Sequence, residues 1–315
     1  MVNKTKLNRT KILELLFRAD GQTLSGVKIS QAAGISRVAV WKHINALKEE
    51  GIPIASQPKG YALAAPEDLL YPFCFRSGVR ERIFHYHEVK TTMDTAKDLA
   101  RQGAPHLSCC VAEHQTRGRG RLNRNWITAG GGLWFTLILK PDLPPPMVYI
   151  FNFAASLSLS RVINRLFDLK TTVKWPNDLL LEGKKLTGLL SEMETQADLI
   201  KFLVIGIGVN INNDPSNESF EAISLKNVLG KPVSRRLVLT EFLDDFEALT
   251  RNTDIPGIMS MWKGQTSTIG TRVRVETQND TVSGIALDVD DAGTLIVETD
   301  TGQIRNIIYG DCFYN

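Results

Sequence analysis

Four arginines interleaved with glycines form the most distinctive chemical pattern in this 315-residue chain. They lie in a segment that runs from Glu113 to Trp126 and reads Glu-His-Gln-Thr-Arg-Gly-Arg-Gly-Arg-Leu-Asn-Arg-Asn-Trp. Glycine lets the backbone approach a ligand closely, and clustered guanidinium groups repel one another until an anion binds. The pattern therefore favours an anion-binding loop; a solvated basic loop and an arginine–glycine segment that binds single-stranded RNA are the alternatives.

Short apolar runs at 106–111 and 133–139 flank this loop, and their composition is typical of β-strands. The loop should therefore join two core strands. A further strand is expected at 201–212, where one face is apolar and the other carries only Gly206, Gly208, Asn210 and Asn212. A strand face with so little side-chain bulk indicates close approach by a ligand or by another backbone.

The N-terminal 65 residues are basic, with ten Lys and Arg against four Asp and Glu, while the whole chain carries a net charge of only +3. Helices are expected at 10–18, 25–33 and 36–50, followed by two short apolar runs around a turn at Lys59. This order is typical of a winged helix-turn-helix, whose third helix enters the DNA major groove. A helical protein-interaction domain is the alternative. The residues predicted to contact DNA are Ser36, Arg37, Trp41, Lys42, Asn45, Lys48 and Lys59.

Short strands dominate the C-terminal part, at 272–276, 282–288, 294–299 and 304–309, and predict a small antiparallel barrel. Between the two ends the pattern predicts a mixed sheet with helices. The fold class is thus α+β, with domains at residues 1–65, 66–265 and 266–315. The central helices are expected at 94–101, 147–167, 237–252 and 258–262.

Composition favours a cytoplasmic protein without a membrane segment. No apolar run is expected to be long enough to span a membrane, and the N-terminus lacks the apolar core of a signal peptide. The four cysteines show no metal-binding or redox spacing, so they are expected to be core thiols in a reducing cytosol. His85 and His87 share a strand face, but the sequence offers no third metal ligand near them. They are therefore expected to bind other protein groups, and no protein-bound metal is predicted.

Four motifs follow one another in a fixed order: Gly118-Arg-Gly-Arg121 with Arg124 and Trp126, Lys174-Trp-Pro-Asn-Asp178, Lys185-Leu-Thr-Gly188, and Gly206-Ile-Gly-Val-Asn210. Together with the basic head and the small C-terminal barrel, they make the sequence resemble the biotin protein ligases, and among them the bifunctional ligase/repressor class. The resemblance covers essentially the full length. It implies a central domain similar to class II synthetases and an SH3-like C-terminal barrel.

The resemblance implies a two-step reaction. Biotin attacks the α-phosphate of ATP, in the presence of Mg²⁺, to give biotinyl-5'-AMP and pyrophosphate. A lysine of the biotin carboxyl-carrier protein of acetyl-CoA carboxylase then takes the biotinyl group and releases AMP. The implied second activity is repression of biotin synthesis genes, with biotinyl-5'-AMP as corepressor, a homodimer as the binding form and operator DNA as the partner.

The site residues that the resemblance implies fall into three groups. The catalytic group is Lys185, Arg121 and Arg119. The biotin group is Thr91, Thr92, Met93, Gln115, Gly118, Arg119, Gly120, Arg121 and Lys185. The nucleotide group is Arg124, Trp126, Asn177, Asp178 and Asn210, with Mg²⁺ near Asp178. Two positions depart from the family pattern, Asn123 in place of glycine and Met93 in place of asparagine.

Two other functions remain open on the sequence. One is a non-enzymatic transcription regulator that senses biotin without activating it, and the other is a lipoate-type ligase on a related scaffold.

Overall fold

The computed structural model describes residues 4–121, 124–196, 199–216, 221–252 and 254–314. The chain forms two compact units, Met1–Glu81 and Arg82–Asn315. The predicted boundaries after residues 65 and 265 stay predictions; within the second unit the central and C-terminal parts lie together.

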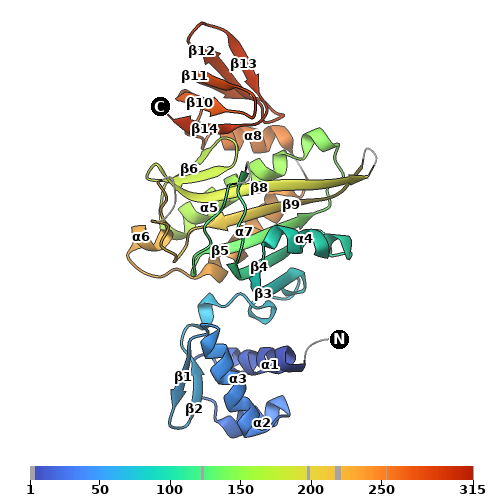
Figure 1. Cartoon of the computed structure of the whole chain (residues 1–315), viewed down its shortest axis with the longest axis vertical. Helices are drawn as coiled ribbons and strands as arrows, with labels where there is room; N and C mark the ends of the chain where they lie inside the picture. The colour runs from blue at the N-terminus through green and yellow to red at the C-terminus, as the bar shows by residue number, and fades with distance from the viewer. Residues whose placement is uncertain (1–3, 122–123, 197–198, 217–220, 253, 315) are drawn as a thin grey trace. The chain divides into compact units, whose positions relative to one another are not determined.

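The first unit is the expected helix–helix–turn–helix followed by a hairpin (Figure 1). Ser25 and Ser36 cap the second and third helices through their side chains, and Gly34 takes the left-handed conformation that ends the second helix. Its elements are α1 (Lys4–Arg18), α2 (Gly26–Ala33), α3 (Arg37–Glu49), β1 (Ile54–Gln57) and β2 (Gly60–Leu63).

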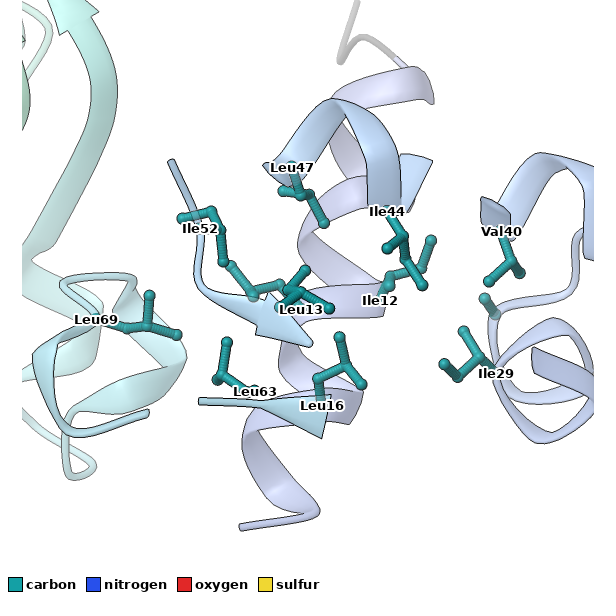
Figure 2. Close-up of a cluster of buried hydrophobic side chains, with 12 residues drawn as sticks. Ile12, Leu13, Leu16, Ile29, Val40, Ile44, Leu47, Ile52, Leu63 and Leu69 are labelled. Atoms are coloured by element: carbon teal, nitrogen blue, oxygen red, sulfur yellow. The ribbon is translucent and has the colours of Figure 1, made fainter. Parts of the chain in front are cut away.

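The predicted inner face of α3 is confirmed, because Val40, Ile44 and Leu47 are buried in one core with side chains of α1 (Figure 2). Leu69 packs into the same core, so the segment after the hairpin also belongs to this unit. That segment holds three short 3₁₀ turns, η1 (Pro66–Asp68), η2 (Pro72–Cys74) and η3 (Arg80–Arg82).

The second unit is built on a seven-stranded mixed sheet in the order β3-β4-β5-β9-β8-β7-β6. Only β3 and β4 run parallel; every other neighbouring pair is antiparallel. The strands are β3 (Ile83–Val89), β4 (Ser108–Gln115), β5 (Leu133–Leu139), β6 (Thr171–Lys174), β7 (Asp178–Leu181), β8 (Lys184–Gln196) and β9 (Leu199–Val209).

Helices cover both faces of this sheet (Figure 1). On β5, Thr136 faces α4 through a hydrogen bond to Thr92, whereas its neighbour Phe135 packs its ring against Phe242 of α7. Successive strand residues point to opposite faces, so α4 and α7 lie on opposite sides. The helices are α4 (Thr92–Arg101), η5 (Pro145–Met147), α5 (Ile150–Phe167), α6 (Leu225–Leu229), α7 (Arg235–Thr250) and α8 (Ile255–Lys263).

One segment corrects the membrane argument made from the sequence. Pro145–Phe167 is long and apolar enough to cross a membrane by length and composition alone. In this fold 78% of its apolar window is buried, as expected for the core helix that α5 forms between the sheet and helices α7 and α8.

The C-terminal part is a five-stranded antiparallel sheet in the order β13-β12-β11-β10-β14. The four predicted strands are confirmed, and a fifth, β14, was missed. Closure into an SH3-like barrel stays a prediction. The strands are β10 (Arg272–Glu276), β11 (Thr281–Val289), β12 (Leu295–Thr299), β13 (Ile304–Ile307) and β14 (Asp311–Tyr314).

Candidate active site

A cavity of about 370 Å³ opens in the second unit, and most of the predicted site residues line it. Its walls come from the start of α4, the arginine–glycine loop, the β6–β7 connection, β8, β9 and β14. The predicted residues in its lining are Thr91, Thr92, Met93, Gln115, Arg119, Gly120, Arg121, Arg124, Trp126, Asn177, Asp178 and Lys185. Residues that lie up to 223 positions apart in the sequence, from Thr91 to Tyr314, thus meet around one space.

The glycine face of β9 is approached closely, but by side chains of the chain itself and not by the ligand or backbone that its composition predicted. The strand ends at Val209, so Asn210 and Asn212 lie beyond it. A Cβ atom on Gly208 would lie 2.6 Å from Nε1 of Trp126, and one on Gly206 would lie 2.8 Å from Sδ of Met93. Gly188, opposite Gly208 on β8, would meet the same indole at 2.7 Å. A side chain at Gly188, Gly206 or Gly208 would therefore displace Trp126 or Met93, and these two residues line the cavity.

Polar groups gather at the N-terminus of α4. The side-chain oxygen of Gln115 accepts hydrogen bonds from the backbone N–H of Thr92, at 2.7 Å, and from its hydroxyl, at 3.1 Å. Thr91 caps the helix by accepting from the N–H of Met93. These three polar side chains lie together at one end of the cavity, where a buried neutral polar ligand would need partners.

Four cations of the cavity are matched by oxygen atoms of the chain itself. Arg119 pairs with Asp94 and with Glu192, each at 3.0 Å, and Arg124 pairs with Asp311 at 2.7 Å. Lys185 Nζ lies 2.8 Å from Asp178 Oδ1, and Arg121 donates to the amide oxygen of Asn177 at 3.3 Å. These contacts hold the side chains of Arg119, Arg121, Arg124 and Lys185 in position.

Burial lowers the pKa of Arg121, and the nearby carboxylates of Asp311 and Asp178 act in the opposite direction. Arg121 is also fixed through Asn177, whose amide group donates to the carbonyl of Leu189 on β8. A guanidinium held in a partly desolvated position attracts an incoming anion more strongly than one in bulk water.

Both ends of the arginine–glycine loop are tied to one buried residue. Arg235, at the start of α7, donates to Glu113 Oε2 at 2.7 Å and to the carbonyl oxygen of Gly132 at 3.4 Å. His85 lies 3.1 Å from the other carboxylate oxygen of Glu113. Burial alone would raise the pKa of Glu113, but the hydrogen bonds and charges of His85 and Arg235 lower it to about 2.

Two predicted site residues, Asn210 and Gly118, are not in the cavity lining. Asn210 is fully buried and accepts a hydrogen bond from the Asn213 amide, and its backbone links to Leu186 and Leu225. Gly118 packs against the backbone of Trp126, where a Cβ atom would lie 2.3 Å from the carbonyl oxygen. Asn123 lies outside the described residues. The described parts therefore give Asn210 and Gly118 structural contacts, and their predicted ligand contacts stay predictions.

Sequence reasoning missed several residues of the site. Asp94, Glu192 and Asp311 pair with its arginines, and Phe313 and Tyr314 of β14 line the cavity. Charge pairs between distant elements leave no local signal in a sequence. Lys174, which also lines the cavity, stands in a motif that was recognised but received no role.

The predicted DNA-binding residues are grouped on α3 and in the hairpin turn of the first unit. Arg37, Trp41, Lys42 and Lys59 are exposed, with Trp41 55% exposed beside Val38 at 64%. Asn45 is half-buried, and Lys48 reaches across to the Ser56 hydroxyl of β1 at 2.8 Å. Ser36 caps α3, as its bond to the N–H of Ala39 shows. A basic, partly aromatic helix face is thus available at the surface of this unit.

The chain matches three family models, each over one of its parts. The biotin/lipoate A/B protein ligase family matches residues 86–210, an HTH domain matches residues 8–62, and the biotin protein ligase C-terminal domain matches residues 268–314. All residues that line the cavity, except Glu221, fall in the first and third of these ranges.

Relatives are similar over nearly the full length. The chain is 37% identical to the bifunctional ligase/repressor BirA of Bacillus subtilis (strain 168), over 96% of this chain and 97% of the relative. It is 27% identical to the BirA of Escherichia coli (strain K12), over 92% of each. Among solved structures, the biotin protein ligase from Aquifex aeolicus in complex with biotin and ATP aligns with a TM-score of 0.64 and 24% identity, over 74% of this chain and 98% of that one.

Proposed function

This chain belongs to the family of bifunctional biotin ligase/repressors, and from that membership we propose how its own residues perform the two activities. The enzyme is a biotin–protein ligase, and its N-terminal unit is a DNA-binding domain of the helix-turn-helix type. The observation that carries the proposal is the single cavity in which the loop arginines, Lys185 and the polar end of α4 meet.

The first step requires two anions to meet. The biotin carboxylate attacks the α-phosphorus of ATP, a new oxygen–phosphorus bond forms, and pyrophosphate leaves with the electron pair of the broken bond. At about 4 Å two unit charges interact by about 1 kcal/mol in water but about 4 kcal/mol at an effective dielectric of 20, so cations already positioned in a partly buried site are effective. Lys185 binds the carboxylate in place of Asp178, and Arg121 contacts the α-phosphate.

The neutral end of the vitamin fits the polar end of the cavity. Thr91, Thr92 and Gln115 supply hydroxyl and amide groups to the ureido ring, while the thioether of Met93 borders the apolar, sulfur-containing ring of biotin. Arg119, Gly120 and Gly118 belong to the loop over biotin and the adenylate. Arg119 is the cation whose present partners, Asp94 and Glu192, lie on α4 and β8.

The nucleotide occupies the side of the cavity near Trp126, Arg124 and Asn177. Mg²⁺ enters as part of MgATP. The oxygens of Asp178 and Asp311 are of the kind this ion prefers, and Mg²⁺ usually binds through one or two carboxylates together with substrate phosphates and water. In the second step a lysine amine of the biotin carboxyl-carrier protein attacks the anhydride carbonyl, an amide forms, and AMP leaves.

One assay tests the enzyme proposal directly. Purified protein is incubated with MgATP and with biotin, lipoate or octanoate, and both pyrophosphate release and transfer to a carrier domain are measured. Biotin-dependent release followed by transfer is expected. Release with lipoate in preference to biotin would move the chain to the lipoate ligases, and the absence of any release would favour a pure biotin sensor. Lys185→Ala should suppress the first step, with Lys184→Ala as the matched control.

For repression, we propose that bound biotinyl-5'-AMP orders the arginine–glycine loop and favours a homodimer that presents two N-terminal units to operator DNA in the cytoplasm. The loop is tied at both ends, and between them Arg119 and Arg124 pair with carboxylates of other elements. An anionic ligand that competes for these arginines should therefore change how the loop is ordered. Analytical ultracentrifugation with and without biotin plus MgATP measures the dimer fraction. Equal fractions in the two conditions would refute this coupling.

A further inference from the structure

Lys174 differs from the other cations of the cavity in the partner it has. It ends β6, pairs in register with Asp178 on β7, and lines the cavity. Its ammonium lies 4.6 Å from the ring centroid of Tyr314 on β14. Among the described residues no carboxylate lies within ion-pair distance of Lys174, whereas Arg119 has two such partners and Arg124 and Lys185 have one each.

The Tyr314 ring is itself held firmly. Its hydroxyl group lies 2.8 Å from the Ser267 hydroxyl and 3.0 Å from that of Thr268, and Thr268 also accepts the backbone N–H of Trp175 at 2.9 Å. Burial raises the pKa of Tyr314 to about 12, so the ring stays a neutral phenol at physiological pH. The residue that follows Lys174 and the ring beneath its ammonium are therefore fixed by the same hydroxyl of Thr268.

An ammonium placed on an aromatic face is oriented without being neutralised. A carboxylate partner would have to be displaced by an incoming phosphate, whereas the face of the ring leaves the N–H donors on the other side of the ammonium available. Lys174 is thus pre-positioned for an anion from outside the chain. During adenylation the group that gains most negative charge is the leaving pyrophosphate.

We propose that Lys174 binds the β- and γ-phosphates of ATP and stabilises the pyrophosphate as the bond to the α-phosphorus breaks, and that Tyr314 is the residue that positions Lys174. The inference rests on the proposed ligase function. In the reaction, the biotin carboxylate oxygen bonds to the α-phosphorus, and the electron pair of the broken phosphorus–oxygen bond passes to the pyrophosphate oxygen that Lys174 contacts.

Kinetics of the separate half-reactions test the assignment. Lys174→Gln should lower kcat/KM for ATP by about tenfold to a hundredfold and should raise the KM for pyrophosphate in the reverse reaction, from biotinyl-5'-AMP to ATP, by a similar factor. Transfer from preformed biotinyl-5'-AMP to the carrier involves no pyrophosphate and should lose far less. Lys184→Gln, a change of the same charge on the exposed end of the β7–β8 hairpin, is the control.

The tyrosine is tested by two substitutions. Tyr314→Phe keeps the ring under the ammonium and should leave the KM for pyrophosphate within a few-fold of the wild type. Tyr314→Leu removes the aromatic face and should reproduce part of the Lys174→Gln defect. Circular dichroism melting curves check that both variants fold.

Each outcome bears on one claim. Unchanged pyrophosphate kinetics in Lys174→Gln, or an equal loss in both half-reactions, would overturn the role of Lys174. Equal defects in Tyr314→Phe and Tyr314→Leu would overturn positioning by the ring. A wild-type protein that releases no pyrophosphate with biotin would instead defeat the proposed function itself.

Discussion

Substitution of Gly208 by alanine is the most direct test of how the cavity is built. The added Cβ would lie 2.6 Å from Nε1 and 2.7 Å from Cε2 of Trp126, whereas ordinary contacts begin near 3.4 Å. The indole would have to move by roughly 1 Å, away from β9 and towards the cavity. It cannot retreat along β8 either, because Gly188 already lies against the other edge of the same ring.

The expected cost follows from the packing. Forcing one extra methyl group into a packed contact costs about 1–3 kcal/mol, and about 1.4 kcal/mol corresponds to a tenfold change in an equilibrium constant. If Trp126 contacts the nucleotide, the KM for ATP in biotin-dependent pyrophosphate release should rise by about 5- to 150-fold. Biotin affinity, measured by calorimetry without ATP, should change less, because Thr91, Thr92 and Gln115 are not displaced.

A matched control is available in the same loop region. At Gly130 an added Cβ would meet only His114, at an ordinary 3.6 Å, so Gly130→Ala should behave as the wild type. The same KM for ATP in Gly208→Ala and Gly130→Ala would refute the reasoning, since it would mean that the position of Trp126 does not matter for the nucleotide.

Three more predictions concern the loop, its anchor and the DNA-binding unit. Arg121→Gly should loosen retention of the adenylate, so that biotin appears on unrelated lysines of added albumin while pyrophosphate release persists; undiminished retention would contradict the role of Arg121. Because the folded-state pKa of Glu113 is lowered from 4.5 to about 2, its contribution of about 3 kcal/mol is present above pH 4.5 and is lost as pH falls towards 2. Urea unfolding of the wild type should therefore lose more stability between pH 5 and pH 3 than that of Glu113→Gln, and parallel losses would argue against the anchor. Lys42→Gln should reduce the slope of log binding constant against log salt concentration by about 0.9 in anisotropy measurements with duplex DNA, and an unchanged slope would remove Lys42 from the phosphate contacts.

The elements that periodicity defines were predictable from the sequence. The inner face of α3 follows from a spacing of 3.6 residues and is confirmed. The bare glycine face of β9 follows from a spacing of 2 residues, but side chains approach it where a ligand or a backbone was expected. The fifth strand of the C-terminal sheet was missed, because Asp311–Tyr314 is only four residues long and directly follows the turn at Gly310. Short strands of this kind are fixed by pairing with a distant neighbour, here β10, and their own composition says little.

The site was predictable only in part, because several of its residues come from distant elements that carry no motif. Motifs indicated the cations, since the resemblance carries them residue by residue. Their anionic partners, Asp94, Glu192 and Asp311, could not be found, because each comes from a different element and none stands in a recognisable pattern. The identity of the groups that approach the β9 glycines was equally hidden, as the side chains belong to Trp126 and Met93, each more than eighty positions away from the glycine it meets.

The pairing of the loop arginines with carboxylates elsewhere in the chain has a consequence for protein engineering. Transplanting residues 113–126 alone onto another scaffold would carry the guanidinium groups but leave Asp94, Glu192 and Asp311 behind. Such a graft would start with several uncompensated positive charges and would attract nucleic acids and other polyanions indiscriminately. A portable version of this site must therefore include α4, β8 and β14, so the smallest transferable module is nearly the whole second unit.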